Sequence, residues 1–113
     1  MVGQTTKKQQ TGSLAATALV FTYTIPDLIG ISALKNVMMK FSSGVTGDIV
    51  VTLDSIDGAA YDVVLKTQTV NGATSFVYAP EGEITFHKGD ILQVDVPKTA
   101  GSTYGLTANF RGV

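Results

Sequence analysis

The chain has 113 residues, with 8 Lys and Arg against 9 Asp and Glu and a formal net charge of −1. This length fits one domain with a single hydrophobic core, and the near-neutral charge argues against nucleic acid as a partner. The absence of cysteine excludes a disulfide framework, a thiolate metal site and a cysteine nucleophile.

The N-terminal residues 1–13 are polar and show no periodicity, which predicts a flexible arm that orders only against a partner. Residues 14–113 are expected to form the folded domain. Lys7 and Lys8 precede an apolar run at residues 14–21 and mimic a secretory leader, but the run continues into alternating residues where cleavage would be expected, which favours a strand. No run approaches the roughly 18 apolar residues of a membrane span, so no membrane partner is expected.

From Leu19 onward, apolar and polar residues alternate with the period of a β-strand, and helix signals are scarce. Turns are predicted at Gly44 and Gly47, at Asn71-Gly72, and at the Lys88-Gly89-Asp90 stretch. The predicted inward-facing rows are Leu19, Phe21, Tyr23 and Ile25; Val37, Met39 and Phe41; Ile49, Val51 and Leu53; Tyr61, Val63 and Leu65; Leu92, Val94 and Val96; and Tyr104, Leu106, Ala108 and Phe110.

About eight short strands with regularly spaced turns predict an all-β, single-domain antiparallel β-sandwich of the jelly-roll type. An immunoglobulin-like sandwich is the alternative, although the paired cysteines and core tryptophan typical of that fold are missing.

The densest group of carboxylates lies in VVTLDSIDGAAYDVVL at residues 50–65, which contains Asp54, Asp57 and Asp62. In the predicted register Asp54 and Asp62 face outward on facing strands, and Asp57-Gly58 occupies the turn. A calcium loop needs alternating carboxylates followed by a glutamate at the twelfth position, where this sequence has Leu65. A glycosidase pair needs a cleft that a solvated loop does not provide. The stretch is therefore predicted to be a hairpin without a metal.

Other catalytic patterns are also missing from the sequence. His87 is the only histidine, so neither a histidine triad nor a two-histidine zinc site can form. The glycine-rich segments lack the spacing of a phosphate loop, and no serine lies in a nucleophile elbow. We expect a protein that is not an enzyme and that has no catalytic residues and no cofactor.

Five apolar residues fall on strand faces that should meet solvent. Charged residues make up only 15% of the chain, a composition common where subunits pack together. These residues are therefore candidates for a subunit interface, with ordinary surface exposure as the alternative. They are Val20, Met38, Val50, Val64 and Ile91.

Two stretches, TLDSIDGAAYDVVLKTQTV at residues 52–70 and ITFHKGDILQVDVPKTAGSTYGLTANF at residues 84–110, resemble small β-sandwich virion structural proteins of tailed bacteriophages. The shared features are a strand ending in a TLDS turn into GAAYD, a KGD entry to a late strand, and a closing TYGL strand. The resemblance implies a non-enzymatic virion component, such as a head decoration (cement) protein or a small neck or tail protein. It carries over no binding residue.

The leading hypothesis is a capsid decoration protein that contacts copies of itself and other virion proteins such as the major capsid protein. A trimer is the expectation from the fold class, and the location would be the virion after synthesis in the host cytoplasm. The alternative is a carbohydrate- or ligand-binding module that uses loop aspartates and aromatic rings. The absence of tryptophan and the inward rows of Tyr61 and Tyr104 favour core packing for the rings. The rings concerned are Tyr61, Tyr78, Tyr104, Phe76 and Phe86.

Overall fold

The computed structural model describes residues 5–15, 19–26 and 32–112, and its regular structure is almost entirely β-strand. All strand pairs are antiparallel, which confirms the predicted fold class. In chain order the elements are β1 (Thr5–Ser13), β2 (Leu19–Thr24), β3 (Ser32–Asp54), the 3₁₀ turn η1 (Ala59–Tyr61), β4 (Val63–Tyr78), β5 (Ile84–Phe86), β6 (Ile91–Asp95) and β7 (Thr103–Gly112).

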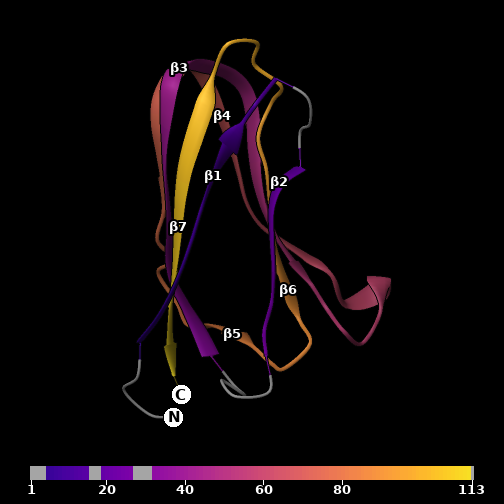
Figure 1. The fold of residues 1–113 in the computed structure, drawn as a ribbon. Coiled ribbons are helices and arrows are strands. Elements are labelled where there is room, and N and C mark those ends of the chain that lie inside the picture. Colours follow the sequence, from indigo (N-terminus) through magenta and orange to yellow (C-terminus); the bar gives the residue numbers. More distant parts are fainter. Residues whose placement is uncertain (1–4, 16–18, 27–31, 113) are drawn as a thin grey trace.

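The strands β3 and β4 are long and bent, and each contributes to both layers of a sandwich (Figure 1). Residues 32–41 of β3 pair with β7 on one edge and with β5 and the end of β4 on the other, and β1 lies beyond β7. These segments form the first sheet. Residues 47–54 of β3 pair with the start of β4 on one edge. On the other edge, residues 50–54 pair with β6, and β2 lies beyond β6. These segments form the second sheet, and the four-plus-four arrangement is that of a jelly roll.

The bends of β3 and β4 lie at the glycines that the sequence assigned to turns. Gly47 has a φ of 129° and Gly72 a φ of 68°, conformations that side chains with a Cβ rarely adopt. A Cβ on Gly44 would lie 3.0 Å from the Cα of Gly72, so the two strands approach closely at the bend. Register shifts at this point mark bulges, which let a strand turn a corner without ending. Two predicted turns are bends, which joins the eight predicted strands into six, and β1 adds a seventh strand to the described chain.

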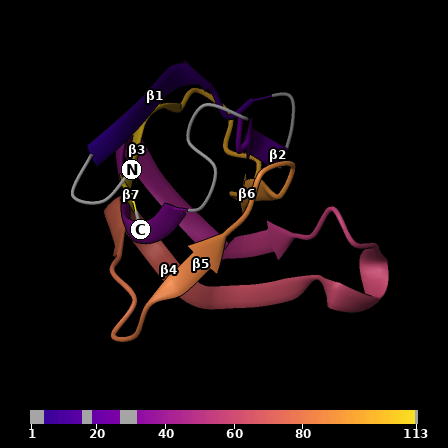
Figure 2. The same ribbon diagram turned by 90° about the horizontal axis from the view of Figure 1, so that it is seen from below.

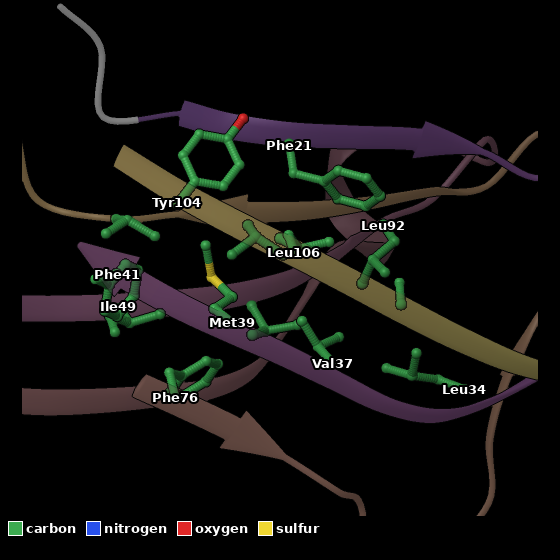
Figure 3. Close-up of a cluster of buried hydrophobic side chains, with 14 of the residues drawn as sticks. Phe21, Leu34, Val37, Met39, Phe41, Ile49, Phe76, Leu92, Tyr104 and Leu106 are labelled. Atoms are coloured by element: carbon green, nitrogen blue, oxygen red, sulfur yellow. The ribbon is translucent and has the colours of Figure 1, made fainter. Parts of the chain in front are cut away.

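The core lies between the two sheets and is built from most of the predicted inward rows. Val37, Met39 and Leu106 of the first sheet pack toward Phe21 and Leu92 of the second (Figure 3). All five side chains are at most 4% exposed. Burying a side chain of this size contributes about 1.5–3 kcal/mol, so this row of contacts holds the sheets together.

The flexible arm predicted for residues 1–13 is corrected by the structure over Thr5–Ser13, which forms the edge strand β1 and pairs with β7 along its whole length. The side of β1 that faces the interior is polar. Lys8 Nζ lies 5.8 Å from the centre of the Tyr23 ring, and Gln10 Nε2 donates to Tyr104 Oη at 2.6 Å. Such an edge strand carries no apolar alternation, and its inward-pointing lysine discourages pairing with other chains. The sequence pattern therefore gave no indication of strand β1.

The predicted inward row of Tyr61, Val63 and Leu65 is largely wrong. Tyr61 is 64% exposed and Val63 is 50% exposed, while Leu65 is half-buried. Figure 2 shows the reason: the far end of the β3–β4 hairpin extends beyond the sandwich, so no opposite layer covers it. Alternation reports which residues share a face, but it does not report whether anything covers that face.

Candidate functional site

The aspartate-rich stretch is a hairpin, as predicted, and its carboxylates support the loop. Ser55 donates its backbone N–H to Asp62 Oδ1 at 2.8 Å, and Gln93 Nε2 donates to Asp54 Oδ2 at 3.1 Å. Partial desolvation and the neighbouring Asp62 carboxyl group raise the pKa of Asp54. Asp57 is exposed at the tip, where Gly58 takes a φ of 118°. The three carboxylates do not converge on a single point.

A fourth carboxylate, Asp90, lies beside the base of this hairpin and is only 5% exposed. Its Oδ1 accepts the backbone N–H of Ile56 at 3.0 Å, and its Oδ2 accepts that of His87 at 2.9 Å. The Lys88-Gly89-Asp90 stretch is therefore a turn held by its own carboxylate. Among the described residues, no three histidine, aspartate or glutamate side chains are placed to hold a metal ion.

The aromatic side chains proposed for a sugar platform are mostly part of the core. Phe76 and Tyr104 are at most 7% exposed, and Phe86 is fully buried. Tyr78 is half-buried, and this burial raises the pKa of its hydroxyl. Tyr61 alone of the five is largely exposed, at the hairpin tip. A stacking platform needs several exposed rings on one face, so these five rings do not form one.

Three of the five candidate interface residues lie together on the outer face of the second sheet. The outward positions along this part of β3 include Val50, Thr52 and Asp54. Val64 of β4 pairs with Thr52, and Ile91 of β6 pairs with Asp54, so both side chains lie on the same face as Val50. Val64 is 60% exposed, while Val50 and Ile91 are half-buried. The remaining outward positions are rich in threonine. They include Thr22, Thr24, Thr52, Thr67 and Thr69.

The same outer face carries negative charge. Asp48 and Asp54 of β3 and Asp95 of β6 point outward with the three apolar residues, and Thr69 Oγ1 donates to Asp48 Oδ1 at 2.6 Å. Desolvation by burial raises the pKa of Asp95. Among the described side chains that point outward from this sheet, none is lysine or arginine. Sequence reasoning missed this acidic face, although the spacing of Asp48, Val50 and Asp54 along β3 already places them on one side.

The other two candidates are separated from this group. Met38 lies on the outer face of the first sheet, where it is 41% exposed and pairs with Val77, which is 63% exposed. The side chain of Val20 lies outside the described residues. The five candidates therefore do not form one patch.

The outer face of the first sheet carries positive charge. Lys7 of β1, Lys40 of β3 and Arg111 of β7 occupy outward positions, and Lys35 is exposed at the bulge of β3. Arg111 Nη2 lies 3.2 Å from Glu83 Oε2, in the segment that follows β4. Gly105 leaves a hollow of about 530 Å³ bordered by Thr11 and Lys40. The two outer faces of the sandwich thus carry charges of opposite sign.

No protein family model and no curated protein matches the sequence. One similar solved chain comes from Bacillus endospore appendages, which form a novel family of disulfide-linked pili. The two sequences are 18% identical, the match covers 99% of this chain and 88% of that one, and the TM-score is 0.42. Another comes from infectious bursal disease virus, Gx strain, with 17% identity, coverage of 98% of this chain and 31% of that one, and a TM-score of 0.40. Over the described part of the chain, no helix is long and apolar enough to cross a bilayer. Function must therefore be argued from the geometry of the chain itself.

Proposed function

We propose that this chain is a non-enzymatic structural protein of a virus particle, a decoration protein that stabilises a capsid through contacts between subunits. The observation that carries this proposal is the outer face of the second sheet. There Val50, Val64 and Ile91 lie together among threonines, on regular strands rather than on loops. A face of this kind suits contact with another protein surface better than it suits a small molecule.

The side chains of this face suit an interface for a second reason. Valine, isoleucine and threonine are branched at Cβ and already restricted about χ1. They therefore lose little rotamer freedom when a partner covers them, which lowers one cost of association. Apolar area removed from water contributes about 25 cal/mol per Å², and a standard interface buries about 800 Å² on each partner. Burial of this face is the proposed source of binding energy.

The first test is the mass of the chain in solution, measured by light scattering over a range of concentrations. The expected result is a mass above the 11.8 kDa of one chain, which falls toward that value in a Val64→Lys variant. Tyr61→Lys is the matched control, because Tyr61 is similarly exposed, at 64% against 60% for Val64, but lies at the hairpin tip. A monomeric wild type, or equal masses in the Val64→Lys variant and the wild type, would contradict an interface on this face.

The virion location needs a separate test. Genes beside the one that encodes this chain should include those for capsid and portal proteins if the protein is a decoration protein. Neighbouring genes for carbohydrate-active enzymes would contradict the proposal and favour a sugar-binding module. This result does not depend on which surface of the chain makes the contacts.

A further inference from the structure

We infer that copies of this chain bind one another head to tail, with the acidic outer face of the second sheet of one copy against the basic outer face of the first sheet of the next. This inference rests on the proposed structural function and names the two surfaces and the partner. The partner is a second copy of the same chain.

The acidic surface is defined by Asp48, Asp54 and Asp95, which surround Val50 and Val64. Their charges come from β3 and β6, which are neighbours in the sheet, so they are fixed on a rigid layer. No described side chain that points outward from this sheet carries a compensating positive charge. An isolated monomer therefore presents an uncompensated negative face around an apolar centre.

The basic surface mirrors this composition on the opposite side of the sandwich. Lys7, Lys35 and Lys40 lie on the same side of the sandwich as the exposed pair of Met38 and Val77, and none of these three lysines has an acidic partner among the ion pairs found in the described chain. Arg111 is the fourth cation of this face, but Glu83 neutralises it at 3.2 Å. Lys35 shares a hollow with Glu81 and Glu83, so Lys7 and Lys40 carry the uncompensated positive charge that faces the three aspartates when two copies stack. An apolar pair lies within each face.

Charge also decides the orientation of the contact. A two-fold contact would bring two acidic faces or two basic faces together, and like charges placed opposite each other across an interface cost free energy. The head-to-tail contact instead pairs opposite signs. A heterologous contact of this kind closes into a ring or repeats as an open chain. The two faces lie on opposite sides of the sandwich (Figure 2), so the contact is expected to repeat as an open chain rather than to close as a trimer.

The test uses two charge-reversed variants of the full chain. The first, Asp48→Lys with Asp95→Lys, makes both faces basic; the second, Lys7→Glu with Lys40→Glu, makes both faces acidic. The wild type is expected to show a mass that rises continuously with concentration at about 10 mM salt and falls toward the monomer at about 1 M, because the Debye length shrinks from about 30 Å to about 3 Å. Each variant alone is expected to be at least ten-fold weaker in self-association than the wild type, and an equimolar mixture is expected to recover association.

Recovery in the mixture is the decisive result, because only a contact between faces of opposite sign predicts it. The controls are Asp57→Lys, matched to the single reversal Asp48→Lys, and Lys66→Glu with Lys98→Glu, matched to the double reversal of Lys7 and Lys40; each changes the net charge as its counterpart does, at exposed residues outside the two faces. Circular dichroism confirms that each variant is folded. If a double variant is unfolded, the single reversals Asp48→Lys and Lys40→Glu replace it and are mixed in the same way.

The outcomes separate this inference from the proposed function. A wild type that associates, together with a variant mixture that does not recover, overturns the head-to-tail contact but leaves a structural role through another contact. A wild type that stays monomeric at low salt also overturns the head-to-tail contact. The decoration role is then judged by the neighbouring genes alone.

Discussion

The buried carboxylate of Asp90 accepts the backbone N–H of Ile56 at 3.0 Å and thereby ties the turn before β6 to the base of the β3–β4 hairpin. The second oxygen of the same carboxylate accepts the N–H of His87. One side chain therefore satisfies two backbone donors from segments that are more than thirty residues apart in the chain.

Asp90→Ala is expected to lower the free energy of unfolding by about 1–3 kcal/mol, because it leaves two part-buried backbone donors without their acceptor. Urea denaturation followed by circular dichroism measures this loss. Asp57→Ala, at the exposed tip of the same hairpin, is the control and should stay within about 0.5 kcal/mol of the wild type. Equal stabilities of the two variants would show that the Asp90 bonds contribute nothing.

Deletion of residues 1–13 is expected to destabilise the fold itself, because β1 pairs with β7 along nine positions and its removal exposes the edge of β7. The expected observations are a lower urea midpoint and aggregation through the new edge. A smaller cut that removes residues 1–4 leaves β1 intact and is the control. If the longer deletion keeps the urea midpoint of the wild type, then residues 5–13 behave as the arm that the sequence suggested.

Gly44→Ala is expected to destabilise the bend where β3 and β4 approach each other. The new methyl group would lie 3.0 Å from the Cα of Gly72 and 3.1 Å from its carbonyl carbon and oxygen, so the backbone must move. Overpacking of this kind costs about 1–3 kcal/mol, and thermal unfolding reports it. Gly82→Ala is the matched control, because a Cβ there meets no atom within 4 Å. If Gly44→Ala unfolds at the same temperature as Gly82→Ala, the contact between Gly44 and Gly72 at the bend is not tight.

The acidic face predicts a particular dependence of stability on pH. Burial raises the pKa of Asp95 above its usual 3.8, so the folded state binds the proton more tightly than the unfolded state does. The stabilisation from this proton is complete below about pH 3.8 and is lost as the pH rises through the raised pKa. At neutral pH, Asp95→Asn should therefore be at least as stable as the wild type.

The measurement is the free energy of unfolding from pH 3 to pH 7 at low protein concentration, for the wild type and for Asp95→Asn. The difference between them should be small at the acidic end and should grow in favour of Asp95→Asn above the raised pKa. Asp57→Asn changes the net charge equally at the exposed hairpin tip and is the control. The opposite trend, with the variant less stable at neutral pH, would mean that the Asp95 carboxylate gains a partner in the folded state.

The sequence alone was sufficient for the fold class and for most of the core. Alternation with a period of two identified the inward rows that contain Phe21, Val37, Leu92 and Leu106, all of which are buried. The Asp57-Gly58 turn was also readable, because the conformation it requires depends on those two residues and their immediate neighbours. These features are local, and local chemistry determines them.

The tertiary structure decided the rest. The glycines at 44, 47 and 72 permit either a turn or a bend, and only the pairing of β3 with β4, β6 and β7 makes them bends. The polar strand β1 gave no signal, since its stability comes from β7, which lies about a hundred residues further along the chain. The opposite charges of the two outer faces likewise depend on which strands become neighbours. Alternation fixes the side of a strand on which a residue lies, but long-range pairing determines which residues share a surface and what covers it.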